Sequence, residues 1–248
     1  KQIMPEVFYK RTPAWIKIRE MMWQEQFQKD YLNYEQCEER FKSQDPTLKE
    51  DTVKTILKLL NKIGVIVTYL DDERLDESLN STYILKPEWV TTGIYAILTD
   101  SQISDENGRF TIQDLKRIFQ TPKYQERYPS HKYDFLIGLL KKFELCYKAE
   151  GSDLYFIPQL FTENEMAHHW NSQQALKLKF AYQDDLIGQI FPRLIVQNHH
   201  KITQNFSWRR GMYLELQGCK AKIYYPINES NIYIEIIIEP KFKIKSIF

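Results

Sequence analysis

Hydrophobic and polar positions repeat along the first 158 residues of the chain. Pro13-Ala14-Trp15-Ile16 opens one apolar stretch, and Pro87-Glu88-Trp89-Val90 opens another 74 residues later. Proline suits the first turn of a helix, where its missing N–H has no partner to lose. Apolar residues then follow at roughly helical spacing, which predicts one helix after each proline. They are Ile16, Met22, Trp23 and Phe27 in the first stretch, and Val90, Ile94, Ile97 and Leu98 in the second.

Each of these helices is followed by a short apolar piece and a helix-capping signal. Tyr31-Leu32 precedes Asn33, with Gln36 three residues later, and Arg109-Phe110 precedes Thr111, with Asp114 three residues later. A side-chain oxygen at such a position accepts from the exposed N–H groups of the first turn, and the residue three positions on can bond back. The pattern predicts that a second helix starts at each site.

A third helix and two strands complete each repeat. The third helices have the apolar faces Val53, Ile56, Leu57, Leu60, Ile63 and Phe135, Leu136, Leu139, Leu140, Phe143. The predicted strand pairs are 65–69 with 82–85, joined by the acidic loop 71–77, and 144–148 with 154–157, joined by the turn 150–153. Helix, short strand, helix, helix, hairpin is the order of a winged helix. It occurs at about 13–85 and again at about 87–158, so we predict a tandem winged-helix-like subdomain over 1–174.

The pattern changes after Pro158. Thr162 and Glu165 have capping spacing for a short helix, and 176–182 alternates as a half-buried strand does. A helix is expected over 186–200 despite Pro192, and strands over 208–217, 220–225 and 232–239. Residues 175–248 are therefore predicted to form a small β-rich α+β subdomain. Only nine residues follow its last strand, so we expect that it is truncated. The predicted fold class of the whole chain is α+β.

Composition narrows the functions that this chain can have. Its 248 residues include eight glycines, and the closest pair, Gly211 and Gly218, is seven apart. Standard phosphate loops and the hydrolase elbow need closer glycines, so we expect no GTP, ATP or other cofactor in this chain. No apolar run approaches the roughly 18 residues of a membrane span. The scattered Cys37, Cys146 and Cys219 favour a reducing, cytoplasmic location.

Candidate reactive and charged residues do not assemble into a convincing catalytic site. Glu165 and His168 have the E-x-x-H spacing of diiron helices, but the motif occurs once, and the pairs His168-His169 and His199-His200 lack further ligands. We expect no metal site and no catalytic residue, and a metal-dependent enzyme stays a minor alternative. Winged helices often bind DNA through the third helix. Here that helix in the second repeat has only Lys141 and Lys142 at its end. The loop 71–77, which is the wing of the first repeat, is acidic and would repel phosphate. Nucleic-acid binding is therefore the less favoured alternative.

Four segments together resemble a known family. They are Leu85-Lys86-Pro87-Glu88-Trp89-Val90-Thr91, Phe143-Glu144-Leu145-Cys146-Tyr147, Tyr155-Phe156-Ile157-Pro158 and Trp208-Arg209-Arg210-Gly211-Met212-Tyr213-Leu214. They look like the COR domain of Roco proteins, COR meaning C-terminal of Roc, a Ras-like GTPase domain. The resemblance runs from about Pro13 to Pro240. It implies a non-catalytic domain that packs against Roc and dimerises, mainly through its C-terminal subdomain. GTP or GDP would then belong to a Roc domain absent from these residues, and some family members have a kinase after COR.

The predicted function is therefore a dimerisation and interaction domain that relays the nucleotide state of an adjacent Roc domain. Its candidate partner-binding residues are Trp208, Arg209, Arg210, Tyr213 and Ile237. Arginine forks suit carboxylates on a partner surface, although two solvated arginines beside a buried tryptophan are an equal alternative. Ile237 is apolar on the strand face that otherwise carries Tyr233 and Glu235, which is typical of an exposed strand that finds a partner. The alternative is that it lies beneath the helix 186–200.

Overall fold

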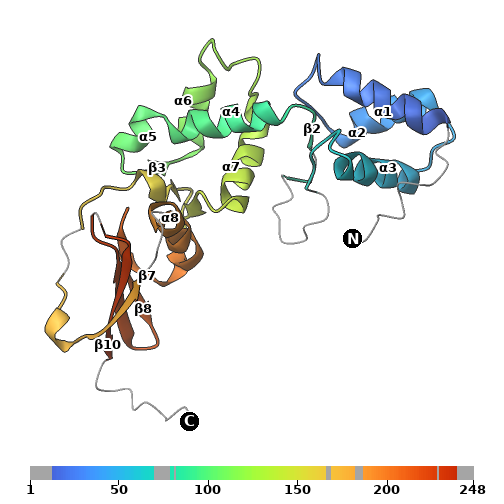
Figure 1. Cartoon of the computed structure of the whole chain (residues 1–248). Helices are drawn as coiled ribbons and strands as arrows, with labels where there is room; N and C mark the ends of the chain where they lie inside the picture. The colour runs from blue at the N-terminus through green and yellow to red at the C-terminus, as the bar shows by residue number, and fades with distance from the viewer. Residues whose placement is uncertain are drawn as a thin grey trace, which may run out of the picture. The chain divides into compact units, whose positions relative to one another are not determined.

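The computed structural model describes residues 13–69, 79–80, 82–165, 169–181, 187–227 and 229–238. The chain folds into two compact units, one of residues 1–95 and 124–139 and the other of residues 96–123 and 140–248. Helices fill the first part of the chain and a five-stranded sheet the last, which confirms the predicted α+β class (Figure 1).

The first unit begins with three helices packed on one apolar core. They are α1 (Pro13–Glu25), α2 (Tyr34–Gln44) and α3 (Glu50–Lys62), and the two-residue strands β1 (Tyr31–Leu32) and β2 (Tyr83–Ile84) pair antiparallel beside them. Met22 of α1, Phe41 of α2 and Leu57 of α3 are all completely buried in this core. The pattern of α1 was predicted only partly correctly, because Ile16, Trp23 and Phe27 are exposed.

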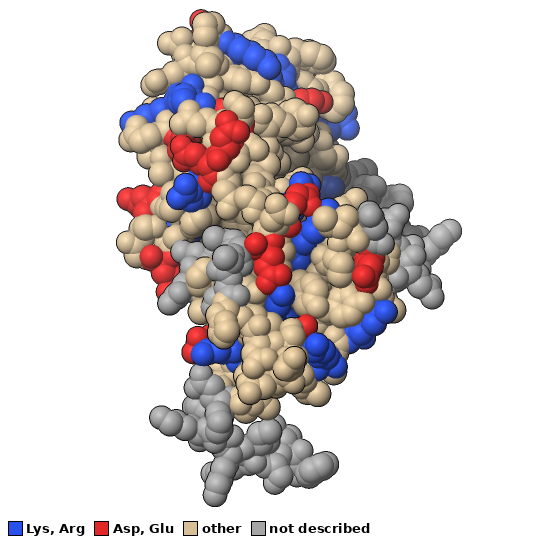
Figure 2. All heavy atoms as spheres, turned by 90° about the vertical axis from the view of Figure 1, so that its left-hand side faces the viewer, with Lys and Arg blue, Asp and Glu red and all other residues tan. Residues whose placement is uncertain are grey.

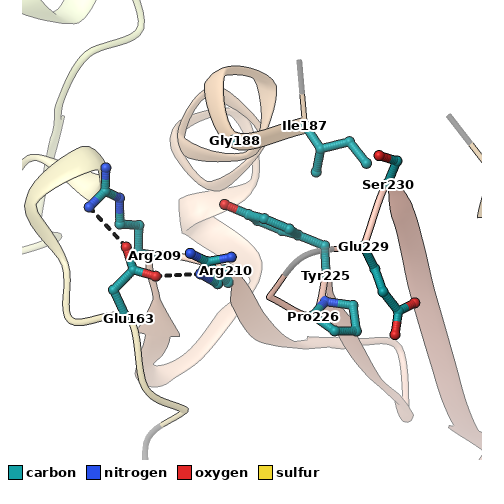
Figure 3. A pocket seen from close by; sticks show the side chains of 9 residues that line it. All are labelled: Glu163, Ile187, Gly188, Arg209, Arg210, Tyr225, Pro226, Glu229 and Ser230. Carbon is teal, nitrogen blue, oxygen red and sulfur yellow. Dashed lines mark hydrogen bonds and ion pairs between the residues drawn. The ribbon is translucent and has the colours of Figure 1, made fainter. Parts of the chain in front are cut away.

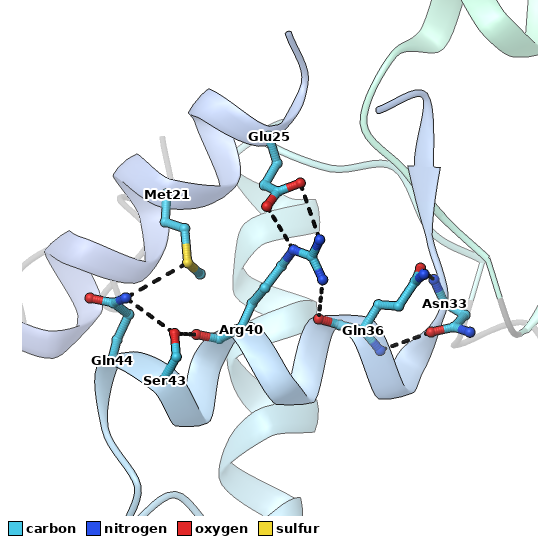
Figure 4. A network of polar contacts seen from close by, with 7 residues as sticks. All are labelled: Met21, Glu25, Asn33, Gln36, Arg40, Ser43 and Gln44. Atoms are coloured by element: carbon cyan, nitrogen blue, oxygen red, sulfur yellow. Dashed lines mark hydrogen bonds and ion pairs between the residues drawn. The ribbon is translucent and has the colours of Figure 1, made fainter. Parts of the chain in front are cut away.

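Both predicted capping signals are confirmed as full capping boxes. The Gln36 N–H donates to Asn33 Oδ1 at 2.8 Å, and the Asn33 N–H donates to Gln36 Oε1 at 3.0 Å. Thr111 and Asp114 bond in the same reciprocal way at the start of α6 (Ile112–Phe119). Figure 4 shows how α2 is also tied to α1, since Arg40 Nε donates to Glu25 Oε1 at 2.7 Å. Local sequence therefore sets these helix starts, and long-range polar contacts fix the helices to each other.

Trp89, in the first turn of α4 (Pro87–Leu98), holds together parts of the first unit that are distant in sequence. Its buried ring lies 4.6 Å from Tyr31, 5.6 Å from Tyr128 and 5.7 Å from Phe135 of α7 (Tyr133–Lys142), measured between ring centroids. Its indole N–H donates to the carbonyl of Arg127 at 3.0 Å. Aromatic contacts of this kind add to the burial of a large apolar surface.

The second repeat follows the order of the first but has an additional short helix, α5 (Ser101–Asp105), which was not predicted. After α4 come α5, β3 (Arg109–Phe110), α6, a short 3-10 turn (Ser130–Lys132) and α7. The strands β4 (Tyr147–Lys148) and β5 (Tyr155–Phe156) then form a small sheet in the order β3-β5-β4. The first repeat differs at its end, because the predicted strand over 65–69 is reduced to a single bridge between Val67 and Ile84. The acidic loop 71–77 lies outside the described residues.

The C-terminal sheet is antiparallel and runs in the order β6-β10-β9-β8-β7. Helix α8 (Ile187–Asn198) lies on one face of it (Figure 1). Phe191 and Ile195 of the helix share a core with Met212 and Ile232 of the sheet, and with Tyr147, Phe156 and Phe161. The strands are β6 (Leu176–Ala181), β7 (Ile202–Trp208), β8 (Gly211–Leu216), β9 (Cys219–Tyr224) and β10 (Asn231–Ile238).

Three predictions for this region are wrong. The segment 208–217 is not one strand, because Arg209 and Arg210 form the turn of a hairpin between β7 and β8. Strand β6 is not half-buried, because as an edge strand it exposes all six of its residues. No helix occurs over the described residues 162–165, where the backbone bends at Glu163 and Asn164.

Candidate partner-binding surface

The predicted residues Trp208, Arg209 and Arg210 lie at the hairpin between β7 and β8. Trp208 is buried and pairs across the turn with Gly211. A methyl group on Gly211 would overlap the Trp208 indole, so glycine is required here for close approach. The Arg209 N–H donates to the carbonyl of Thr162 at 2.9 Å, which attaches the hairpin to the segment 162–165.

Both arginines bind one carboxylate of the same chain. Arg209 Nη1 donates to Glu163 Oε1 at 3.0 Å, and Arg210 Nε donates to Glu163 Oε2, as Figure 3 shows. The hydrogen bond from Arg210, together with the positive charge of both guanidinium groups, lowers the pKa of Glu163 despite partial desolvation. These arginines therefore have an internal carboxylate as their partner. Glu163 was not identified from the sequence, where Thr162 and Glu165 were interpreted as a helix cap.

Tyr213 and Lys222 bind the second acidic residue of this segment. The Tyr213 hydroxyl donates to Glu165 Oε1, and Lys222 Nζ lies 2.7 Å from the same oxygen. Burial, and then the Glu165 carboxylate, raise the pKa of Tyr213. Lys222 Nζ also lies 4.6 Å from the centroid of the Tyr224 ring, a cation–π distance. The structure thus brings Trp208, Arg209, Arg210 and Tyr213 together along the segment 162–165.

A buried carboxylate fixes the next segment to the same side of the sheet. Glu235 of β10 accepts hydrogen bonds from Trp170 Nε1 at 2.6 Å, from the Ser172 hydroxyl, and from the Tyr224 hydroxyl at 3.2 Å. Desolvation opposes ionisation of Glu235, but the three donors together outweigh it and lower its pKa. Burial, followed by the charge of Glu235, raises the pKa of Tyr224 to about 12.

Ile237 is half-buried and does not lie beneath α8. Helix α8 packs on the face that carries Ile232 and Ile234, and Ile237 points to the opposite face because side chains alternate along a strand. It lines a hollow of about 480 Å³ together with Trp170 and Tyr213. Ile237 and Tyr213 therefore line the same hollow, and Arg209 and Arg210 do not line it.

The largest exposed apolar surface of the sheet involves residues that the sequence did not single out. Leu176, Leu178 and Phe180 of the edge strand β6 pair with Ile236, Ile234 and Ile232. They share the face that α8 covers only in part. Together with Leu216 and Ile238 they form what we call the β6 patch, whose members are between 41% and 60% exposed. The alternation of 176–182 was the available signal, but sequence alone could not show that this strand lies at the edge.

Charged and metal-ligating residues give no other site in the part of the chain that the structure describes. No group of three or more His, Cys, Asp or Glu side chains there is arranged to hold a metal ion. The ring of His199 stacks on Tyr147, and His168 lies outside the described residues. On the face drawn in Figure 2, lysines and arginines are interspersed with acidic residues instead of forming a basic stripe. None of the described helices is long and apolar enough to cross a membrane.

Comparison with known proteins identifies the family. The model described as C-terminal of Roc, COR-A domain matches residues 13–161, and the COR-B domain model matches residues 173–243. The chain is a COR domain of the Roco proteins. The segment 162–172, with Glu163 and Glu165, connects the two matched stretches.

Its relatives are much longer proteins. The COR domain is 29% identical over 193 residues to the Roc-COR-CHAT protease of Runella zeae, which covers 76% of the chain and 19% of that protein. It is 27% identical over 205 residues to the probable serine/threonine-protein kinase pats1 of Dictyostelium discoideum, covering 68% of the chain and 6% of the relative. The chain thus spans less than a fifth of each.

A solved structure of a related protein has the same fold. The structure of Methanosarcina barkeri Roco2 RocCORdC bound to GDP superposes with a TM-score of 0.53 at 26% identity, covering 61% of this chain and 44% of that one. In the COR domain described here, the residues that carry the family resemblance are mainly structural. Trp89, Cys146, Ile157, Trp208 and Met212 are all buried.

Proposed function

We propose that this COR domain is a non-catalytic part of a longer, cytoplasmic Roco-type protein, where it dimerises and responds to the nucleotide state of an adjacent Roc domain. The match of both COR models over 13–161 and 173–243 carries the proposal, because their descriptions place COR directly after Roc. A nucleic-acid-binding winged helix is not favoured by these matches.

The β6 patch supports dimerisation. Five large apolar side chains on one sheet face are more than scattered surface residues, and contiguous apolar surface of this kind marks interaction sites. None of the described strands pairs with the outer edge of β6. Since homodimers mostly have twofold symmetry, the patch would pack on its own copy. This moves the proposed contact from Ile237 to residues on the opposite face.

Point variants test dimerisation better than truncation does. Removing residues 175–248 would uncover Tyr147, Phe156 and Phe161, which share a core with α8 and the sheet. We propose light scattering of the intact chain with Leu178→Ser and Phe180→Ser combined. The wild type should be a dimer at micromolar concentration and the double variant a monomer. Phe27→Ser, which removes an exposed ring just after the end of α1, is the control and should leave the dimer intact. A monomeric wild type would overturn this part of the proposal.

The exposed apolar face of α1 supports contact with Roc. Ile16, Trp23 and Phe27 lie on the outer side of this segment, away from the buried Ile18 and Met22. Helix α1 is the first element of the matched COR sequence, so it is the element nearest in sequence to a domain that precedes COR.

Calorimetry with the Roc domain of the parent protein tests the relay. Trp23→Ser with Phe27→Ser should weaken binding at least tenfold, and the β6 double variant serves as the control. Coupling requires that Roc binds COR with different affinity in its GDP and GTP states, by at least fivefold at the usual coupling energies. If Roc binds COR with the same affinity in its GDP and GTP states, the COR domain is a scaffold and does not relay the nucleotide state.

A further inference from the structure

A second hollow lies behind the arginine turn and has a different character from the one at Ile237. Its volume is about 320 Å³, and its lining includes Arg209, Arg210, Tyr225, Ser230 and the first two residues of α8, Ile187 and Gly188 (Figure 3). These groups come from three separate parts of the C-terminal sheet and its helix. Most of them are hydrogen-bond donors.

Tyr225 is the residue that points to a ligand. Its side chain is 8% exposed, and its hydroxyl is directed into the hollow, towards Gly188 at the start of α8. Among the described residues, that hydroxyl has no hydrogen-bond partner, so it can donate to a ligand in the hollow. A methyl group on Gly188 would come within 3.7 Å of it, so the helix start and the hydroxyl face the same space.

The guanidinium of Arg210 is fixed beside the Tyr225 ring, where it can bind an anion in the hollow. Glu163 engages its Nε, and the guanidinium lies 5.3 Å from the centroid of the Tyr225 ring. A guanidinium has five N–H groups in a planar fork, so the bond to Glu163 leaves the two terminal nitrogens for an anion. The first described residues of α8, Ile187 and Gly188, also line the hollow, and a helix N-terminus attracts anions.

We propose that this hollow binds a phosphomonoester. The guanidinium of Arg210, the hydroxyl of Tyr225 and the start of α8 approach the hollow from three different parts of the chain, which suits a tetrahedral dianion better than a flat carboxylate. Glu163 and Glu229 also line the hollow and limit the affinity. Glu163 is paired with both arginines, and Glu229 accepts from Tyr233 at 2.8 Å. The phosphoryl group belongs either to a small molecule or to a phosphorylated side chain of a peptide.

The test is a titration of the intact chain with inorganic phosphate, followed by ¹H–¹⁵N NMR. The amides of Gly188, Arg210 and Tyr225 should shift together along one saturable curve. Tyr225→Phe removes only the hydroxyl and should weaken binding about fivefold, and Arg210→Gln should weaken it at least tenfold. Arg109→Gln, which removes an exposed arginine from β3, is the charge-matched control and should change the affinity less than twofold.

The outcomes separate specific binding from general attraction. Shifts spread over many basic residues, an equal loss in Arg109→Gln, or unchanged affinity in Tyr225→Phe would each overturn the proposal. A phosphoserine peptide identifies the source. Binding at least tenfold tighter than inorganic phosphate assigns the site to a phosphorylated side chain, and equal binding assigns it to a small phosphate ester. The same peptide with glutamate instead of phosphoserine should bind no more tightly than the unphosphorylated one, and equal binding of the glutamate and phosphoserine peptides would contradict a phosphomonoester site.

Discussion

The backbone of Gly211 lies directly against the indole of Trp208, so that a methyl group on Gly211 would overlap the six-membered ring at Cζ2. The two residues face each other across the β7–β8 hairpin, whose turn residues bind Glu163. Because Gly211 has no side chain, the Trp208 ring can pack directly against the hairpin backbone.

Gly211→Ala should lower the free energy of unfolding by about 2–3 kcal/mol, because overpacking forces a buried side chain or the backbone to move. Urea denaturation monitored by tryptophan fluorescence measures this. Gly188→Ala is the matched control and should be nearly neutral, since its methyl group meets only one atom, at 3.7 Å. If Gly211→Ala and Gly188→Ala lower the free energy of unfolding by similar amounts, the loss comes from the flexibility of glycine and not from contact with Trp208.

Asp30 and Arg127 should be energetically coupled. Arg127 Nε and Nη2 donate to the two oxygens of Asp30 at 2.8 and 2.9 Å, and this pair links parts of the first unit that are 97 residues apart in sequence. A partly buried two-bond pair is stronger than an exposed ion pair. We expect a coupling energy of about 1–2 kcal/mol in a double-mutant cycle of Asp30→Asn and Arg127→Gln. Additive losses would contradict the coupling.

Glu235→Gln should destabilise the protein at neutral pH by about 1.5–3 kcal/mol, because the charged acceptor of three hydrogen bonds is lost. The native pKa of Glu235 is lowered, so its contribution is complete above the unfolded value of about 4.3 and is lost as the pH falls through the native pKa. The difference between wild type and variant, measured in urea, should therefore shrink below about pH 4.3.

Glu150→Gln, on the exposed turn between β4 and β5, is the control for Glu235 and should show no such convergence. A Glu235→Gln difference that stays constant as the pH falls well below that value would mean that packing, not charge, is what the variant loses.

Lys132→Met should raise stability by about 1 kcal/mol at pH 7, because a buried charge that has no carboxylate partner among the described residues costs desolvation energy. Lys132 is 6% exposed and donates to Thr82 at 2.8 Å, and burial lowers its pKa. The unfolded chain binds the proton more tightly, so wild-type stability relative to Lys132→Met should increase as the pH rises from the native pKa towards about 10.4. Thermal denaturation at pH 7 and pH 9.5 measures this. If Lys132→Met is as much more stable than the wild type at pH 9.5 as at pH 7, then Lys132 is not destabilising the protein as a buried charge.

Local signals in the sequence were sufficient for the three main helices of each repeat, but the short helix α5 was not predicted. The capping residues at Asn33 and Thr111 and the prolines at 13 and 87 act on their own first turns, so the pattern alone places these starts. The strand β7 was not predicted, because Ile202–Trp208 mixes polar and apolar residues and its pairing with β8 is irregular. Its turn, Arg209-Arg210, contains no glycine or asparagine to mark a hairpin.

The partners of the candidate residues could not be predicted in the same way. Glu163 binds Arg209 and Arg210 across 46 and 47 residues, and Glu165 binds Lys222 across 57. No periodic pattern connects positions so far apart, and the acidic residues had a sound local interpretation as a cap. The β6 patch depended on strand order, which follows from how the sheet assembles.

The stretch between the two COR matches is bound in both of its described parts, 162–165 and 169–172. The Thr162 N–H donates to Asn107 Oδ1 at 2.5 Å, and its carbonyl accepts from Arg209, while Glu163 and Glu165 bind β-sheet residues and Trp170 and Ser172 bind Glu235. Inserting or deleting a single residue would break contacts on one side to preserve those on the other. Since Glu163, Glu165, Trp170 and Ser172 make these contacts with their side chains, this connection should be sensitive both to their exchange and to a change in its number of residues.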